Sequence, residues 1–136
     1  MPAAALPDTV AALTGVTLIE AARRRRRPAT PSQLARRLLP HYVTTPALEL
    51  ISDALADAIR NPGRRLVIST SPRTGKSLLV SIVGVLYALM CDPDQNVIQV
   101  TYADSLAEEF SHQAKALAAE HPELLGFELS TGEPPI

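Results

Sequence analysis

The sequence has one cysteine and no long apolar run, and both absences limit what the protein is. With Cys91 alone, no internal disulfide can form, and a metal cluster built on cysteines is not expected. A reducing, intracellular setting fits this cysteine usage. The longest apolar stretch, residues 78–90, is interrupted by Ser81 and Gly84 and is too short to cross a bilayer, so we expect no membrane partner. The N-terminus also lacks the basic segment and apolar run of a signal peptide.

The net charge of -1 conceals an uneven distribution of charge along the chain. Residues 1–76 carry twelve lysines and arginines against five acidic residues, whereas residues 77–136 carry one lysine against nine acidic residues. Five arginines, Arg23 to Arg27, are followed by Pro28 and Pro31, which predicts a basic, partly helical and partly disordered arm over residues 1–44. Such an arm suits the phosphates of DNA or an acidic partner, and a merely solvated arm fits the same pattern.

Residues 45–60 have the pattern of an amphipathic helix. Thr45 is suited to cap its start and Pro46 to occupy its first turn, and residues 61–63, Asn-Pro-Gly, are expected to end it. Apolar residues recur in it at helical spacing, namely Leu48, Ile51, Leu55 and Ile59. A shorter helical stretch is expected before Pro40.

Two runs of apolar and β-branched residues, 64–70 and 96–102, predict strands. Each is followed by a predicted helix, the first over residues 76–90 and the second from a capping Asp104 to a point before Pro122. Strands that alternate with helices favour an α/β fold with a parallel sheet. The sequence therefore predicts an incomplete P-loop NTPase over residues 45–126, in the order strand, P-loop, helix, strand, helix, with an irregular tail over 127–136.

A phosphate-binding motif lies between the first predicted strand and its helix. The usual pattern is G-x-x-x-x-G-K-[ST], and the matching window has Thr70 in place of the first glycine. Backbone N–H groups of such a loop point at phosphates, Lys76 would reach the β- and γ-phosphates, and the Ser77 hydroxyl would bind Mg²⁺. A plain strand-to-helix turn capped by a serine is the alternative. The candidate nucleotide-binding residues are Ser71, Pro72, Arg73, Thr74, Gly75, Lys76, Ser77 and Leu78.

Two stretches, 64–81 (RRLVISTSPRTGKSLLVS) and 96–117 (NVIQVTYADSLAEEFSHQAKAL), resemble the start of the ATPase domain of the large terminase subunit of tailed bacteriophages. That family commonly carries a loop P-P-R-x-G-K-S in which the first glycine is dispensable, and Ser71 stands here for the first proline. The family then has an apolar strand, a Tyr-Ala/Ser-Asp turn and a helix that begins Ser-Leu-Ala, which residues 97–107 match. The resemblance extends over roughly residues 32–126.

This resemblance implies a motor in the host cytoplasm that uses ATP and Mg²⁺ to package viral DNA into a prohead. Lys76 and Ser77 take the phosphate and metal roles, and Arg73 takes that of the loop arginine, which senses or stabilises the γ-phosphate. Arg73 and Lys76 are therefore the candidate catalytic residues, and Ser77 is the candidate metal ligand. The implied partners are double-stranded DNA, the remaining terminase segment, the small terminase subunit and the portal.

The acidic pair that ATP hydrolysis needs is not found in this sequence. The reaction requires an aspartate for Mg²⁺ and a residue that orients the attacking water, at the end of a later apolar strand. Asp104 follows the 96–102 run, but in the family this position belongs to the turn into the next helix. We expect an N-terminal ATPase segment that binds nucleotide weakly and does not hydrolyse it alone. The alternatives are a truncated, non-catalytic remnant or interaction module, and a small unrelated P-loop nucleotide-binding protein.

Overall fold

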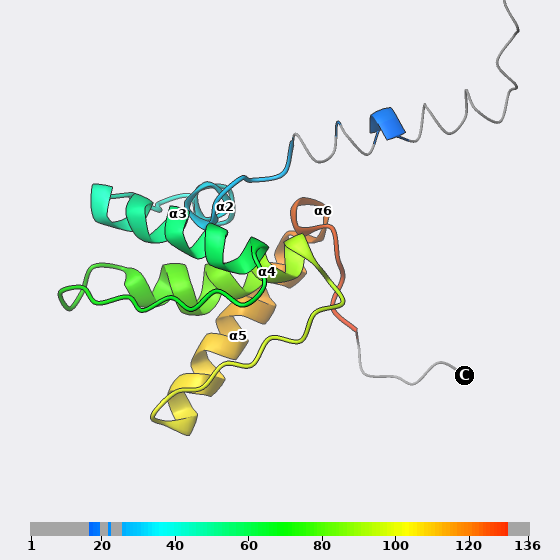
Figure 1. Cartoon of the computed structure of the whole chain (residues 1–136). Coiled ribbons are helices and arrows are strands. Elements are labelled where there is room, and N and C mark those ends of the chain that lie inside the picture. Colours follow the sequence, from blue (N-terminus) through cyan, green and yellow to red (C-terminus); the bar gives the residue numbers. More distant parts are fainter. Residues whose placement is uncertain (1–16, 20–21, 23–25, 131–136) are drawn as a thin grey trace, which may run out of the picture.

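A computed structural model describes residues 17–19, 22 and 26–130 of the chain, and this part consists of helices and the loops that join them (Figure 1). The elements are α2 (Pro31–Leu38), α3 (Pro46–Arg60), the π-helix η1 (Leu78–Val83), α4 (Gly84–Cys91), α5 (Asp104–Glu120) and the short α6 (Pro122–Leu125). None of the helices in the described ranges is long and apolar enough to cross a membrane.

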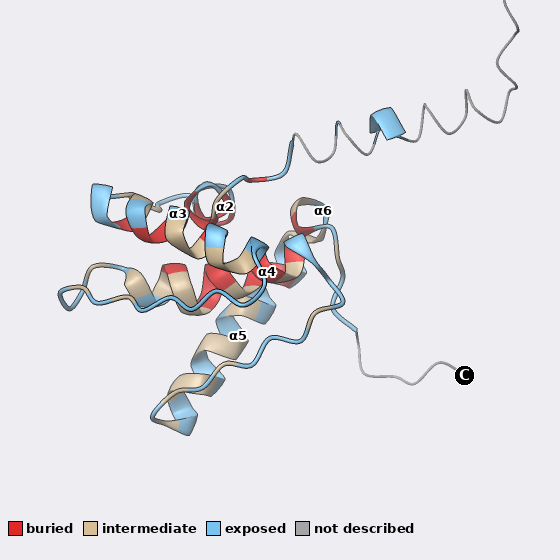
Figure 2. Cartoon of the chain, in the orientation of Figure 1, coloured by how far each residue is buried: buried red, intermediate tan, exposed pale blue. Residues whose placement is uncertain are grey.

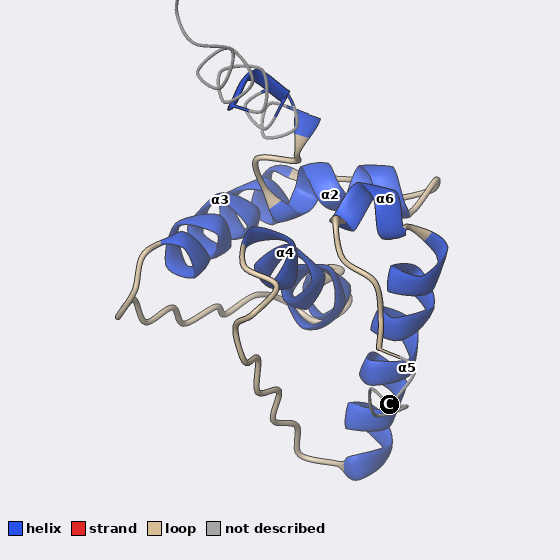
Figure 3. Cartoon of the chain, turned by 90° about the vertical axis from the view of Figure 1, so that its right-hand side faces the viewer, coloured by secondary structure: helices blue, strands red, loops and turns tan. Residues whose placement is uncertain are grey.

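One continuous helix, η1 followed by α4, lies at the centre of the molecule. It contacts α2, α3 and α5 through η1, and α2, α3, α5 and α6 through α4. Figure 3 views this helix nearly along its axis, with α3 on one side, α2 and α6 above and α5 on the other side. Two extended segments, residues 64–71 and 96–101, run along the side of the central helix that the other helices leave uncovered.

The core consists of the apolar side chains that this central helix shares with its neighbours. Leu79, Val83 and Tyr87 are completely buried along it, and Leu34 of α2 is completely buried against them (Figure 2). The same cluster includes Leu48 and Ile51 of α3, Leu86 and Met90 of the central helix, Ala118 of α5 and Leu125 of α6. A helix buried on most of its faces is what the apolar run 78–90 predicts.

Two helices begin in the way the sequence specifies. Thr45 adopts an extended conformation and its side chain accepts a hydrogen bond from the backbone N–H of Leu48, with Pro46 in the first turn. Thr30 and Pro31 repeat this arrangement at the start of α2. The first N–H groups of a helix have no partner within the helix, and the threonine side chain accepts a hydrogen bond from one of them. Proline in the first turn has no N–H, so it adds no unpaired donor. The predictions for the helix over residues 46–60 are confirmed.

The predicted α/β fold with a parallel sheet is wrong for this structure. Residues 64–70 and 96–102 are not strands, because no second backbone lies against either of them, and the described part of the chain contains no sheet (Figure 3). Their apolar, β-branched composition favours an extended backbone, but a strand also needs a neighbour with which to exchange hydrogen bonds. The predicted order of strand, P-loop, helix, strand, helix is therefore realised as coil, loop, helix, coil, helix.

Smaller predictions at the helix ends also differ from the structure. Asp104 is not the N-cap of α5: it is the first helical residue, while Ala103 occupies the cap position without a side-chain hydrogen bond. The predicted helix over 76–90 is helical but includes the π-helical η1, in which the N–H of Gly84 bonds to Leu79 O. The arginine run lies partly outside the described residues, which include only Arg26 and Arg27 of it.

A polar junction, in which Tyr87 is buried and Ala29 and Arg60 are exposed, joins the segment before α2 to the central helix. The hydroxyl of Tyr87 donates a hydrogen bond to the backbone O of Ala29, 2.7 Å away. Arg60, at the end of α3, donates through Nη2 to both the Ala29 carbonyl and the Tyr87 hydroxyl oxygen. Its guanidinium carbon also lies 5.6 Å from the centroid of the Tyr87 ring, within the range of a cation–π contact. Three distant parts of the sequence thus meet at one carbonyl.

Candidate functional site

The predicted phosphate-binding residues lie together in one loop that leads into the central helix. Residues 70–78 line a hollow of about 400 Å³, so all eight candidate residues border the same space. The loop protrudes at one end of the molecule, where segment 64–71 turns back into η1 (Figure 1). Helical turns begin at Lys76, and the N–H of Leu79 bonds to Gly75 O at 3.1 Å.

The backbone of this loop has an unusual conformation at two positions. Arg73 has φ of 61° and Gly75 has φ of 83°, which places both in the left-handed region. Gly75 adopts it without cost, whereas for Arg73 it costs about 1–2 kcal/mol. Arg73 is the single residue other than glycine with a positive φ in the described part of the chain. Alternation of right- and left-handed residues turns successive N–H groups toward one point, which makes an anion-binding concavity.

One further contact shapes the loop. The hydroxyls of Thr70 and Thr74 lie 3.2 Å apart and form a hydrogen bond across its base. Thr70 stands where the usual motif has a glycine, so the substituted residue has a structural part in closing the loop. A Cβ added to Gly75 would lie 3.6 Å from Leu48 Cδ1, an ordinary contact, so the need for glycine there comes from its φ rather than from space.

Three polar side chains of the loop, those of Arg73, Lys76 and Ser77, have no ion pair with the described residues. Lys76 is half-buried, and Arg73 and Ser77 are exposed. The ion pairs among the described residues join Arg36 to Glu49, Arg64 to Asp57 and His121 to Glu120, so none involves the loop. Lys76 and Arg73 therefore carry positive charges that no carboxylate within the described ranges neutralises. These charges, together with the N-terminus of the sixteen-residue helix over 76–91, favour the binding of an anion in the loop.

These residues fit the phosphates of a nucleotide better than they fit a protein-bound metal. No group of three histidine, cysteine, aspartate or glutamate residues within the described ranges is placed to hold a metal ion. Mg²⁺ keeps several waters and is commonly held by one or two protein oxygens together with substrate phosphates. The Ser77 hydroxyl supplies one such oxygen at the first turn of the helix.

The described part of the arginine run lies at a second, basic hollow, apart from the loop. Arg26, Arg27 and Arg37 border a space of about 480 Å³ together with Glu123. Their positions are held by backbone carbonyls: Arg37 Nη1 donates to Arg26 O at 2.6 Å and Arg27 Nη1 donates to Met90 O at 3.4 Å. The sequence predicted a basic arm but not the contribution of Arg37, which approaches from α2.

Sequence reasoning located the loop but missed how its backbone is shaped. The left-handed Arg73 and the Thr70–Thr74 hydrogen bond have no signature in the motif, although a threonine pair at a spacing of four around a turn is a signal that could have been read. A scan against protein-family models and searches of curated proteins and of solved structures found no match to this chain. The similarity to terminases therefore stays a prediction that depends on residues 64–81 and 96–117.

Proposed function

We propose that this chain binds the phosphates of ATP, with Mg²⁺, in the loop of residues 70–78, as the N-terminal ATPase segment of a terminase-type motor that packages viral DNA. The observation that carries the proposal is the loop itself. Arg73 and Gly75, which have a left-handed backbone, border a hollow at the start of the central helix. Lys76 borders the same hollow and has no ionic partner within the described ranges. This combination attracts a polyphosphate.

Each residue of the loop has a distinct part in this proposal. The backbone N–H groups of residues 73–77 donate to phosphate oxygens, Lys76 neutralises the charge of the β- and γ-phosphates, and Arg73 approaches the γ-phosphate from the exposed side. The hydroxyl of Ser77 binds Mg²⁺. The proposal depends on the loop and the helix that follows it, and it does not require a parallel sheet.

The chain by itself is not expected to hydrolyse ATP. In-line hydrolysis needs a carboxylate that holds the metal and a residue that orients the attacking water. The notable carboxylate after the loop, Asp104, is at the first turn of α5, where it complements the helix dipole. Catalysis by Arg73 and Lys76 thus requires acidic groups from elsewhere in the motor, which includes the rest of the terminase, the small terminase subunit and the portal.

DNA is the polymeric partner in this proposal, in the cytoplasm of the infected host. What supports it is the hollow lined by Arg26, Arg27 and Arg37, whose guanidinium groups face no ion-pair partner in the described part of the chain. Phosphate contacts of this kind are electrostatic, so duplex binding should weaken strongly as salt rises. An affinity that does not change with salt would contradict a role for these arginines.

The nucleotide proposal is tested by calorimetric titration of the full chain with Mg²⁺–ATP. Removal of a charge-assisted contact costs about 1.5–3 kcal/mol, so Lys76→Ala should weaken binding by about 10- to 100-fold. Lys115→Ala is the matched control, because Lys115 is the other lysine of the chain and lies on α5, away from the loop. Unfolding curves of both variants report whether the fold is retained.

The outcomes separate the possibilities. Binding that Lys76→Ala weakens and Lys115→Ala leaves unchanged supports a phosphate site in the loop. Equal affinities for the wild type and Lys76→Ala would overturn it, and so would the absence of binding at high micromolar concentrations. Steady Mg²⁺-dependent hydrolysis by the purified chain, lost in Lys76→Ala, would leave the binding proposal standing but refute the statement that the chain does not turn over alone.

A further inference from the structure

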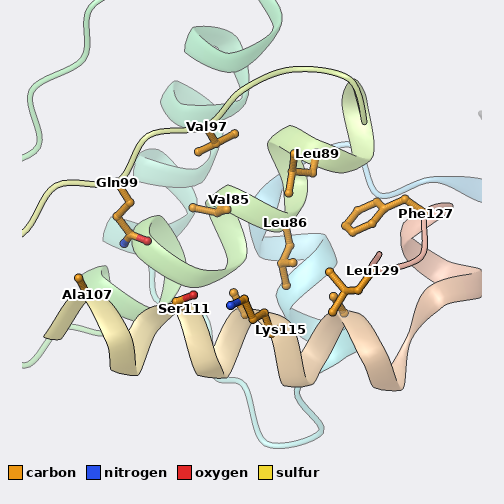
Figure 4. A pocket seen from close by; sticks show the side chains of 12 residues that line it. Val85, Leu86, Leu89, Val97, Gln99, Ala107, Ser111, Lys115, Phe127 and Leu129 are labelled. Carbon is orange, nitrogen blue, oxygen red and sulfur yellow. The ribbon is translucent and has the colours of Figure 1, made fainter. Parts of the chain in front are cut away.

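The two extended segments 64–71 and 96–101 have the side-chain alternation of strands, although neither is paired. In the second segment, Val97 and Gln99 point toward the helices, where they border an apolar pocket of about 450 Å³ between α4 and α5 (Figure 4). Gln99 Nε2 donates to Ser81 O of the central helix at 3.1 Å. Ile98 and Val100 are 87% and 86% exposed. The segment thus lies on the helices with one face and presents an apolar face outward.

The first segment repeats this pattern. Ile68 and Thr70 are half-buried, and Ile68 packs against the core, whereas Val67 between Leu66 and Ile68 is 93% exposed. Many of the large apolar side chains exposed in the described part of the chain lie here: Leu66 and Val67 belong to the first segment, Val97, Ile98 and Val100 belong to the second, and Tyr102 follows it directly. Figure 2 shows most of the backbone of both segments in the colour of exposed residues. Exposed apolar surface of this kind marks an interaction site.

The unpaired backbone N–H and C=O groups of these segments indicate what kind of partner binds them. No N–H or C=O group of residues 64–71 or 96–101 makes a hydrogen bond with other described residues. An extended chain presents alternating donors and acceptors along both edges, and another extended backbone satisfies such a row. A partner that docks here therefore contributes a strand rather than a helix or a small molecule.

The second segment lacks the features that keep such edges monomeric, whereas the first begins with two charged residues, Arg64 and Arg65. Residues 66–71 and 96–102 contain no charged residue, no proline and no glycine. Natural edge strands are commonly interrupted by lysine, proline or a bulge, and uncharged β-branched windows without these interruptions pair with identical windows on other chains. The same sequence is available on every copy of the chain, at the same concentration.

We propose that this chain associates with a second copy of itself by backbone pairing through the extended segments, with residues 96–101 at the contact. Pairing buries Ile98 and Val100 of both copies and satisfies the free backbone groups along the paired edge. A contact of a segment with itself is closed by a two-fold axis, which makes a dimer the smallest assembly. The inference is independent of the phosphate loop, because it uses neither Arg73 nor Lys76.

Sedimentation velocity over a range of concentrations tests the proposal on the full chain. We expect a monomer–dimer equilibrium, and hydrogen exchange should show that amides 97–101 become protected as the dimer fraction rises. Ile98→Lys places like charges across the contact twice in a symmetric dimer and should raise the dissociation constant at least about tenfold. Leu50→Lys is the matched control, since Leu50 is 73% exposed on α3.

A second variant separates strand pairing from undirected apolar contact. Val100→Pro retains apolar surface but removes one backbone donor, so it should also weaken the dimer, whereas Val100→Thr keeps the donor and strand propensity and should weaken it less. Circular dichroism and unfolding curves establish that the helices of each variant persist. A chain that stays monomeric, or a dimer in which amides 97–101 exchange as fast as in the monomer, would overturn the proposal.

Discussion

The junction of Tyr87, Arg60 and Ala29 makes the stability of this protein depend on pH in an unusual direction. Tyr87 is completely buried, and burial raises the pKa of its hydroxyl to about 12 from the ordinary 10.0. The folded protein therefore holds the phenolic proton in a range where the unfolded chain has already released it. The stabilisation by this group is fully present below pH 10 and is lost as the pH rises from 10 through 12.

The difference in unfolding free energy between the wild type and Tyr87→Phe can be worked out from the hydrogen bond and from the pKa of Tyr87. Below pH 10, Tyr87→Phe loses the 2.7 Å hydrogen bond to Ala29 O, at a cost of about 0.5–1.5 kcal/mol. A shift of one pKa unit corresponds to about 1.4 kcal/mol, so at pH 11 the wild type has lost about that amount, which the phenylalanine variant does not lose. The two unfolding free energies should therefore become equal near pH 11, and above it Tyr87→Phe should be the more stable protein.

Urea unfolding of both proteins between pH 8 and pH 11.5 measures this difference, with linear extrapolation of the unfolding free energy at each pH. All other residues are the same in both proteins, so the effects of groups that do not interact with Tyr87 cancel in the difference. Two stability curves that stay parallel from pH 8 to pH 11.5 would refute the reasoning, because they would mean that the hydroxyl of Tyr87 ionises equally in the folded and unfolded states.

Two further predictions concern close packing around α3. Ser52→Ala removes the acceptor of the buried 2.8 Å hydrogen bond from Ser32 N and should cost about 1–3 kcal/mol, whereas Ser32→Ala keeps both the donor and the acceptor of that bond and should cost less; thermal unfolding compares them, and equal losses would contradict the assignment. A Cβ on Gly84 would lie 3.0 Å from Leu55 Cδ2 and 3.3 Å from Leu79 O, so Gly84→Ala should be destabilising by up to about 2 kcal/mol in the wild type and less so in a Leu55→Ala background, which relieves the first contact; additive effects in that double-mutant cycle would refute the clash with Leu55.

The helices could be predicted because their signals are local. Thr45 and Pro46 define the beginning of α3, and the apolar spacing of Leu48 and Ile51 defines its buried face. The prediction for Asp104 was wrong by one position because cap and first-turn acidic residues share the same preference near a helix N-terminus. The π-helical turn in η1 was not predicted, because the apolar run 78–90 is equally compatible with an ordinary α-helix.

The sequence likewise predicted one part of the candidate site and not the rest. A motif match identified all residues of the loop, because the chemistry of phosphate recognition requires Gly75, Lys76 and Ser77 at fixed spacing. It could not predict that Arg73 adopts a left-handed φ or that Arg37 joins Arg26 and Arg27 at a second basic hollow. Both depend on where other parts of the chain are placed.

By itself, the sequence determined where α3 begins, which helix faces are apolar and which residues form the candidate phosphate-binding loop. It also indicated that residues 64–70 and 96–102 are extended, because short runs of β-branched residues favour an extended backbone. Only the tertiary structure decided that these segments are not strands. A helix satisfies its hydrogen bonds within its own sequence, whereas a strand satisfies them on a neighbour, and the described chain places no neighbour beside either segment.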